Sequence, residues 1–469
     1  MSEREFDVII LGAGPAGEVA AGRLGEAGLE VAIVEPHLIG GECSFYACMP
    51  SKALLRPGEL LAEARRIPGV REAVTGDLDV RAVLERRDEI IHGLDDSHME
   101  PWLDERGVAI VRGAGRLDGE RRVRVEDDTL VARRAVVIAT GSAPLMPPIP
   151  GLEEAKPWTN REATTAKEVP ERLVILGGGV VGVEMAQAYA SLGSQVSLVE
   201  GGDRLLGREE PFAGEDVREA LEEKGVDVHL GVRASAVHVE DGTVVVELES
   251  GAGPLRGEQL LVATGRRLNT GDIGLDTVGL EPGKPVEVDD SMRASDWLYA
   301  IGDVNGRALL THMGKYQARV AADVILGEDS TCLITDGERS PRVIFTDPQV
   351  AAVGYTHAAA QQAGLNVRVV DVSTQGAAGA SFYGRDYARG TTRFVVDEDR
   401  GVIVGATFTG PEVAEFLQAA TIAVVGEVPL ERLFHAIPAF PTRSEIWLYL
   451  LEELGVSGPC YPMLAQQPA

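Results

Sequence analysis

The feature that most constrains the fold of this chain is a glycine-rich loop that occurs twice, each time between a predicted strand and a predicted helix. The first copy begins with the apolar strand 6–11 and ends with a strand that closes at Glu35. Its three glycines are Gly12, Gly14 and Gly17. Glycines at this spacing bring a pyrophosphate against backbone amides at a helix N-terminus, and an acid 23 residues after the first glycine binds ribose hydroxyls. The flanking signals predict a dinucleotide site rather than an ordinary turn.

The second copy has the same layout, from the apolar strand 173–176 to a strand that closes at Glu200. Its glycines are Gly177, Gly179 and Gly182. One chain is therefore predicted to carry two dinucleotide sites. A carboxylate beside the adenosine ribose accepts hydrogen bonds from a diol and repels a 2′-phosphate. Glu200 thus favours NADH over NADPH, although Arg204 nearby leaves NADPH as an alternative.

Two further segments match each other, because residues 136–141 and 260–265 are both apolar strands that end in Ala-Thr-Gly. They follow the two glycine loops at similar distances. Each is predicted to close one nucleotide domain and to pass its backbone close to the cofactor. The four segments together indicate an internal duplication and an α/β fold with two Rossmann-like dinucleotide-binding domains.

Cys43 and Cys48 lie five residues apart, just after the first glycine loop and its acid. A thiol pair this close can open and close as a disulfide with little backbone movement. The pair also lies near the start of a predicted helix, where the helix dipole favours the reactive thiolate. A structural disulfide would more usually bridge distant segments, and no second Cys/His pair lies nearby to predict a metal site. A redox role is the favoured interpretation.

Composition limits the partners and the compartment. The chain has 469 residues, enough for about three domains. Its 73 acidic and 44 basic side chains give a net charge of −29, which argues against nucleic acid and anionic membranes as partners. A high-salt habitat is an alternative to a merely acidic surface.

The sequence contains no apolar run of about 18 residues, so no membrane span is predicted. The first strand is too short for a signal peptide, and the few cysteines favour the cytoplasm.

Taken in order, the motifs resemble those of the flavoprotein disulfide reductases, the family that includes dihydrolipoyl dehydrogenase, glutathione reductase and mercuric reductase. The resemblance covers nearly the whole chain. Besides the two glycine loops and the two Ala-Thr-Gly strands, it rests on segments 40–52, 182–184, 299–303, 310–312, 345–349 and 353–354. It implies an FAD-binding domain at residues 1–155 and 271–335, an NAD(P)-binding domain at 156–270, and an α+β dimerisation domain at 336–469. It also implies a homodimer in which each active site combines both chains.

The resemblance assigns cofactor residues by position. It implies that FAD is held by Gly12, Gly14, Gly17, Glu35, Lys52, Gly115, Thr140, Gly141, Asp303, Leu310, Thr311 and His312. It implies that NADH, or NADPH, is held by Gly177, Gly179, Gly182, Glu200 and Gly265. No metal ligands are implied.

The resemblance also assigns catalytic roles. Cys48 would be the charge-transfer thiol nearer the flavin, and Cys43 the interchange thiol that meets the substrate. Lys52 and Glu184 would pair beside the reactive edge of the flavin and tune hydride delivery. Electron supply from NADH through FAD to the disulfide is therefore predicted to be intact.

The chain departs from the family at Phe440, where the usual member has the histidine that serves as acid–base for thiol–disulfide exchange. The carboxylate that orients this histidine is retained as Glu445. Phenylalanine neither accepts nor donates a proton, so reduction of an external disulfide is predicted to be slow. His435 and Tyr46 are weak candidates for a relocated base.

Other family branches also lack this histidine. Mercuric reductase has tyrosine there and a pair of tail cysteines, whereas this chain has only Cys460 near its end. The ketopropyl-coenzyme M carboxylase branch has phenylalanine but loses the lysine and glutamate that are kept here as Lys52 and Glu445. The favoured prediction is an NADH-dependent FAD enzyme with an unidentified small-molecule acceptor. The alternatives are a dihydrolipoyl dehydrogenase-like enzyme with a relocated base, a carboxylase-like or mercuric reductase-like enzyme, and a flavin redox sensor.

Overall fold

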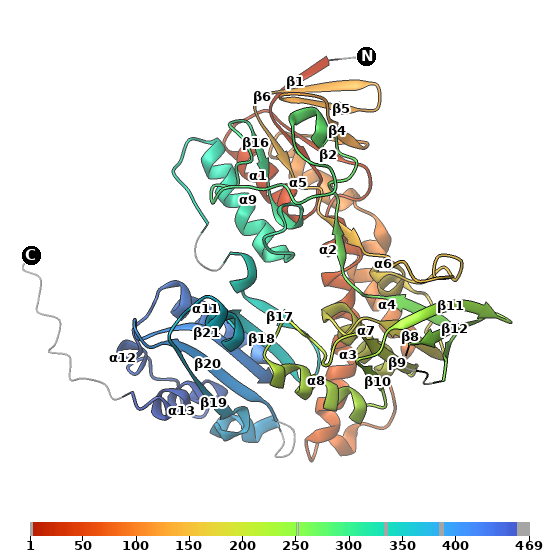
Figure 1. Ribbon diagram of the computed structural model, residues 1–469, viewed down its shortest axis with the longest axis vertical. Coiled ribbons are helices and arrows are strands. Elements are labelled where there is room, and N and C mark those ends of the chain that lie inside the picture. Colours follow the sequence, from red (N-terminus) through yellow and green to blue (C-terminus); the bar gives the residue numbers. More distant parts are fainter. Residues whose placement is uncertain (1–2, 250, 252, 333–335, 384–388, 457–469) are drawn as a thin grey trace, which may run out of the picture. The chain divides into compact units, whose positions relative to one another are not determined.

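The computed structural model describes residues 3–249, 251, 253–332, 336–383 and 389–456 (Figure 1). The chain divides into two compact units. The first comprises Met1–Pro57, Asp79–Val199 and Val232–Glu338, and the second comprises Gly58–Leu78, Glu200–Gly231 and Arg339–Ala469. Cys460 lies outside the described residues. The domain boundaries expected from the sequence stay a prediction.

The first unit is built on a seven-stranded sheet with the order β3-β2-β1-β6-β5-β4, and β16 also pairs with β6. Its strands are β1 (Glu3–Leu11), β2 (Val31–Glu35), β3 (Val108–Arg112), β4 (Gly115–Leu117), β5 (Arg122–Val125), β6 (Asp128–Ile138) and β16 (Leu298–Ala300). The central strand β1 pairs in parallel with both β2 and β6, and Val8 faces Val31 on one side and Ala135 on the other. A parallel strand covered on both faces has a continuous apolar sequence, which is why the segment 6–11 could be recognised.

Helices α1 (Pro15–Glu26) and α9 (Thr311–Ile325) lie side by side against one face of this sheet (Figure 1). Their small residues Ala20, Ala21 and Ala318 are buried in one core with Val8 and Ile10 of β1. Further helices of this unit are α2 (Gly41–Phe45), α4 (Val80–Ile90), α5 (Glu100–Asp104) and α6 (Asn160–Thr165), and α3 (Cys48–Arg66) begins here.

The same unit contains a second parallel β-α-β arrangement. Strands β8 (Arg172–Leu176), β9 (Gln195–Glu200) and β14 (Gln259–Val262) pair in parallel, and α7 (Val180–Ser191) connects the first two. The unit also contains strands that pair in antiparallel fashion: β7 (Ser142–Pro144), β11 (Ala234–Glu240), β12 (Thr243–Leu248), β13 (Leu255–Gly257) and β15 (Arg266–Leu268). The α/β class with two Rossmann-like units is thereby confirmed.

The second unit holds a five-stranded antiparallel sheet with the order β17-β18-β21-β20-β19 (blue in Figure 1). Its strands are β17 (Arg342–Ile344), β18 (Gln349–Gly354), β19 (Val367–Ser373), β20 (Thr391–Asp397) and β21 (Val402–Gly410). Phe394 and Phe408 of the sheet share a core with Ala420 of α11 and Leu450 of α13. The other elements of the unit are α8 (Pro211–Glu223), β10 (Asp227–Leu230), α10 (His357–Gln362), α11 (Leu417–Val425), α12 (Leu430–Leu433) and α13 (Ile446–Glu453).

Candidate active site

The first glycine of each loop meets an Ala-Thr-Gly strand in the same way. Gly12 and Gly177 have φ values of +105° and +109°, a region that L side chains rarely adopt. A Cβ on Gly12 would lie 2.4 Å from the carbonyl oxygen of Ala139, and a Cβ on Gly177 would lie 2.4 Å from that of Ala263. The internal duplication predicted from the sequence is therefore visible in the backbone itself.

The other two glycines of each loop differ in the space that a Cβ would find at their positions. A Cβ on Gly17 would lie 2.0 Å from the carbonyl oxygen of the first glycine, and a Cβ on Gly182 would lie 1.8 Å from its counterpart. Gly14 and Gly179 have no such neighbour within 4 Å and face open space. In each loop the chain itself requires two glycines, and the middle one leaves room for a ligand.

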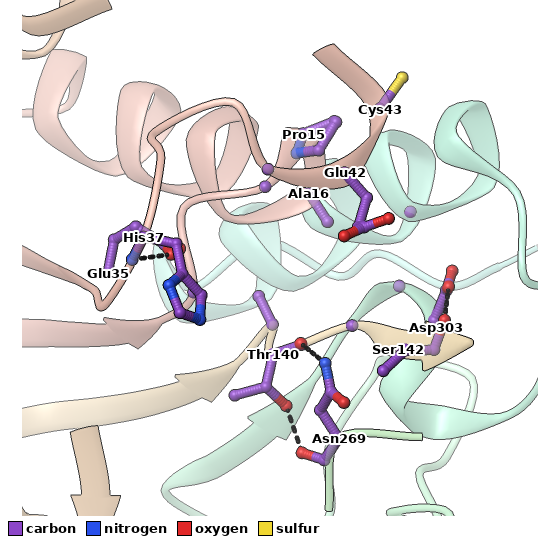
Figure 2. Close-up of a pocket in the computed structure, with 18 of the residues that line it drawn as sticks. Pro15, Ala16, Glu35, His37, Glu42, Cys43, Thr140, Ser142, Asn269 and Asp303 are labelled. Carbon is purple, nitrogen blue, oxygen red and sulfur yellow. Dashed lines mark hydrogen bonds between the residues drawn. The ribbon is translucent and has the colours of Figure 1, made fainter. Parts of the chain in front are cut away.

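A cavity of about 710 Å³ opens beside the first loop, and Figure 2 shows residues from the cysteine-containing segment and from the Ala-Thr-Gly strand around it. All of its lining residues belong to the first unit. The residues assigned to FAD that line it are Gly12, Gly14, Glu35, Gly115, Thr140, Gly141, Asp303, Leu310 and Thr311. Gly17, Lys52 and His312 are not among the lining residues.

Polar groups in the cavity are held in fixed orientations (Figure 2). Glu35 accepts hydrogen bonds from the amides of Ala13 and His37, each at 2.8 Å. Asn269 Nδ2 donates to the carbonyl oxygen of Thr140 at 2.9 Å, and the Thr140 hydroxyl donates back to the Asn269 carbonyl at 2.9 Å. The two hydrogen bonds to Glu35 fix its carboxylate in a position that suits an adenosine ribose.

Asp303 lies at the other end of the cavity and is contacted by Ser142, whose hydroxyl donates to its carboxylate at 2.5 Å. Burial raises the pKa of Asp303, although the Ser142 hydrogen bond and the charge of Arg266 oppose this effect. The size of the cavity, the open space at Gly14 and the acceptors at both ends fit an extended dinucleotide such as FAD.

The two cysteines lie next to this cavity. Cys43 is in the short helix α2 and lines the cavity, and Cys48 is the first residue of α3. The Thr311 hydroxyl, which also lines the cavity, lies 3.4 Å from Cys48 Sγ. Both cysteines are free thiols in the structure. The helix start predicted for this segment is therefore present, with Cys48 at its N-terminus.

The surroundings of the pair give the two thiols different pKa values. A hydrogen bond from the Cys43 thiol, together with the Thr311 hydroxyl and the charge of Lys52, lowers the pKa of Cys48 to about 6. The same hydrogen bond, together with burial, raises the pKa of Cys43 above its ordinary range. At neutral pH the reduced pair thus holds one proton, with Cys48 as thiolate and Cys43 as thiol.

Lys52 and Glu184 meet although they are 132 residues apart in the sequence. Lys52 Nζ donates to Glu184 Oε2 at 2.8 Å, and the Glu184 side chain is only 4% exposed. Lys52 lies one helical turn after Cys48 on α3, so its charge is close enough to favour the Cys48 thiolate. The geometry agrees with the pairing that the family resemblance implies.

Phe440 and Glu445 belong to the second unit and differ sharply in exposure. The Phe440 side chain is 76% exposed, whereas Glu445 is buried. Glu445 Oε2 has no hydrogen-bond partner within the part of the chain that the structure describes. His435, the histidine considered as a relocated base, is exposed and its ring lies against Phe434. The segment thus keeps a buried carboxylate and carries an apolar ring where an acid–base group is expected.

Comparison with known proteins assigns the chain to a protein family. The family model described as pyridine nucleotide-disulphide oxidoreductase matches residues 6–322, and the model of the dimerisation domain of the same family matches residues 340–450. The chain belongs to this oxidoreductase family. It is therefore an FAD-dependent oxidoreductase of the disulfide reductase class that uses a pyridine nucleotide, and it carries the family's dimerisation domain.

Relatives of this oxidoreductase match along nearly its whole length. Dihydrolipoyl dehydrogenase from Chlamydia muridarum is 31% identical over 450 residues, which cover 94% of this chain and 95% of the relative. Mercuric reductase from Shigella flexneri is 33% identical over 460 residues, or 95% of this chain and 80% of the relative. The Cu(II) complex of the HOCl-induced flavoprotein disulfide reductase RclA from Escherichia coli shares the fold, with a TM-score of 0.83, 24% identity and coverage of 96% and 99%. Within the described residues, no helix is long and apolar enough to cross a membrane.

Sequence reasoning missed several residues that the structure brings to this site. Ser142 and Asn269 contact the predicted residues Asp303 and Thr140, but neither lies in a motif of its own. Glu18, in the first turn of α1, is not among the residues that line the cavity, but burial raises its pKa to about 7 despite the nearby charge of Lys315. Glu18 directly follows the third glycine of the first loop, so its position could be predicted but its burial could not.

The lowered pKa of Cys48 predicts the pH dependence of thiol reactivity in the reduced oxidoreductase. The rate of alkylation by iodoacetamide should rise with a midpoint near pH 6, because Cys48 is a reactive thiolate above that pH and a protonated thiol below it. Thr311→Val removes a donor to the thiolate and should move the midpoint upward. The urea-unfolded protein serves as the control and should titrate at about pH 8.5. A midpoint at that value in the folded protein would contradict the assignment.

Proposed function

We propose that this oxidoreductase transfers electrons from NADH through FAD to the Cys43–Cys48 pair and then to a small-molecule acceptor other than a simple disulfide. The observation that carries the proposal is the one-proton thiol pair beside the cofactor cavity, in a chain with Phe440 in place of the acid–base. FAD, when bound, would supply the two-electron carrier between the nicotinamide and the thiols. The proposed catalytic residues are Cys43, Cys48, Lys52 and Glu184.

The two nucleotide sites are proposed from their loops. FAD would occupy the cavity beside Gly14, with Glu35 at its ribose end and Asp303 at its opposite end. The nicotinamide cofactor would be held at Gly177, Gly179, Gly182 and Gly265. Glu200 ends β9, and its Oε1 accepts a hydrogen bond from the Gly202 amide at 2.6 Å, which fixes the carboxylate that favours NADH.

The class of acceptor is proposed from the protons that each reaction requires. Reducing an external disulfide releases thiolates that need protonation, and general acid–base groups contribute about 10²–10⁴-fold to such steps. Phe440 supplies none. Metal ions are reduced without taking up a proton, and a quinone can take its two protons from solvent. Neither these acceptors nor one-electron acceptors and carbon-centred substrates release thiolates that a histidine must protonate. The mercuric reductase relative makes Hg(II) a reasonable member of any acceptor panel, and Cu(II) belongs there by chemistry.

The dimerisation domain supports a proposed homodimer, and the cysteine content supports a proposed compartment. A homodimer would bring segment 435–445 of one protomer to the thiol pair of its partner, as in the family. The low cysteine content favours a reducing compartment such as the cytoplasm, where a disulfide is more often catalytic than structural. Phe440 and Glu445 would then shape the face that meets the acceptor.

Anaerobic titration of the holoenzyme with NADH tests the proposal. We expect the absorbance of oxidised FAD to fall, a long-wavelength thiolate–flavin band to appear, and the uptake of two equivalents of NADH. NADPH should reduce the protein more weakly because Glu200 repels its 2′-phosphate. A protein that binds no FAD, or whose FAD stays oxidised, would overturn the proposal.

An acceptor panel then separates the alternatives. Fast lipoamide turnover that is lost in His435→Ala would support a dihydrolipoyl dehydrogenase-like enzyme with a relocated base. Turnover only with quinones or metal ions would support the function proposed above. Reduction by NADH without turnover of any acceptor would favour a redox sensor.

A further inference from the structure

The short helix α6 holds both sides of the segment that contains Cys43. The side-chain amide of Asn160, its first residue, donates to Glu42 Oε2 at 2.9 Å and to the carbonyl oxygen of Tyr46 at 2.8 Å. Glu42 precedes Cys43, and Tyr46 lies two residues before Cys48. An amide group has only two protons, so both are used to hold residues that flank the thiols.

Two neighbours of Asn160 strengthen this contact. Arg161 Nε donates to Glu42 Oε1 at 2.5 Å, and the Arg161 guanidinium lies over the Tyr46 ring at 4.8 Å. The Thr164 hydroxyl lies 3.0 Å from the Tyr46 carbonyl oxygen and 2.8 Å from the Asn160 carbonyl oxygen, so it links the helix to the cysteine segment. We call Asn160, Arg161 and Thr164 the α6 clasp.

The helix that carries the clasp is itself anchored. A capping box between Thr159 and Glu162 fixes its N-terminus. The buried Tyr189 hydroxyl donates to the carbonyl oxygen of Ala163 at 2.6 Å, and the fully buried Arg87 donates to the carbonyl oxygens of Thr164 and Ala166. The helix that carries the clasp is therefore held in place independently of the cysteine segment.

The start of the cysteine segment is held from the other side. The Gly40 amide donates to the carbonyl oxygen of Ala13 at 2.8 Å. A Cβ on Gly41 would lie 2.9 Å from Gly14 Cα, so the segment rests directly on the first glycine loop. Between this contact and the α6 clasp, the backbone around Cys43 has little freedom to move.

We propose that the α6 clasp is a positioning device that sets the equilibrium between the dithiol and disulfide forms of Cys43 and Cys48. In the disulfide form the covalent bond itself restrains the segment. In the dithiol form that bond is absent, and the clasp, together with the contacts of Gly40 and Gly41, keeps Cys43 close to Cys48. Loss of the clasp would give the dithiol form more conformational freedom and make ring closure less favourable. This inference rests on the proposed relay and adds a function for residues outside it.

The test measures this equilibrium directly. The FAD-loaded protein is equilibrated anaerobically with mixtures of reduced and oxidised glutathione, then quenched with an alkylating agent and analysed by mass spectrometry. In the reaction, the disulfide bond of oxidised glutathione breaks and the Cys43–Cys48 bond forms. Both protein sulfurs are oxidised; the one proton that the pair holds and one proton from solvent end on two molecules of reduced glutathione. For Asn160→Ala we expect the equilibrium constant for disulfide formation to fall about tenfold, which corresponds to about 30 mV for this two-electron couple.

Matched variants separate positioning from folding. Thr164→Val removes a hydroxyl that contacts Tyr46 and should lower the constant, and Thr164→Ser should restore it. Thr165→Val is the control, because the Thr165 hydroxyl donates to the Arg161 carbonyl oxygen within α6, at 2.7 Å, and has no hydrogen bond to the cysteine segment among the residues that the structure describes. FAD content and melting temperature are recorded for each variant.

The outcomes distinguish the two proposals. If the wild-type protein forms no Cys43–Cys48 disulfide in any glutathione mixture, the relay itself is wrong. If the disulfide forms but Asn160→Ala and Thr164→Val leave the constant within about twofold of wild type, the clasp does not position the thiols. A lower melting temperature without a change in the constant would likewise assign α6 a purely structural role.

Discussion

Replacing Cys43 by serine is expected to halve the NADH uptake of the enzyme, from two equivalents to one, because FAD still accepts electrons but no disulfide remains to receive them. Turnover of an acceptor that takes its electrons from the thiols should fall by about 10³-fold or more, as expected when a reacting nucleophile is removed. Cys48→Ser should have the same effect on uptake and should also abolish the long-wavelength band, because Cys48 carries the thiolate. Anaerobic titration and steady-state rates measure both effects.

Cys332→Ser provides the matched control for these variants. Cys332 is also a free thiol, but burial raises its pKa to about 12, so it is protonated and unreactive at neutral pH. We expect this variant to behave as wild type. Unchanged turnover in Cys43→Ser would show that the acceptor takes electrons directly from the cofactor, and the thiol relay would then be wrong.

The glycine loops could be predicted from the sequence because their constraint is local. Gly12 and Gly177 have positive φ and would clash with a neighbouring carbonyl if they carried a Cβ, so the chain tolerates little else there. The strands β1 and β8 could be recognised for a similar reason, since burial on both faces requires apolar residues throughout. These local signals were therefore enough to predict the duplicated fold.

The interactions that tune the site could not be predicted, because they join residues that only the topology brings together. The hydroxyl that contacts Cys48 belongs to Thr311, which is 263 residues away. Asn160, which holds the segment around Cys43, lies in a six-residue helix with no motif of its own. The predicted helix start was enough to predict that a thiolate is favoured in the Cys43/Cys48 pair, but not to predict which neighbours lower the pKa of Cys48.

The variant Phe440→His tests the second half of the reaction, in which the thiol pair reduces an external acceptor. We expect this variant to reduce lipoamide or another small disulfide about 10²-fold faster than wild type, the lower end of what a general acid–base contributes. The structure gives a physical reason for this expectation. Glu445 is buried, and its Oε2 has no hydrogen-bond partner among the described residues, so a carboxylate that could orient an imidazole is already in place. Steady-state kinetics with NADH and lipoamide measure the gain.

Two controls make the result specific to a proton-transfer group. Phe440→Leu changes the shape of the side chain without adding an acid–base and should give no gain. Phe440→His combined with Glu445→Gln should lose most of the gain, because the amide cannot stabilise an imidazolium as the carboxylate does. Reduction of the thiol pair by NADH should be the same in all of these variants, since that half of the reaction needs no base. A single Phe440→His variant with wild-type disulfide turnover would mean that another group already supplies the proton. His435 and Tyr46, the candidates for a relocated base, are then the residues to replace next.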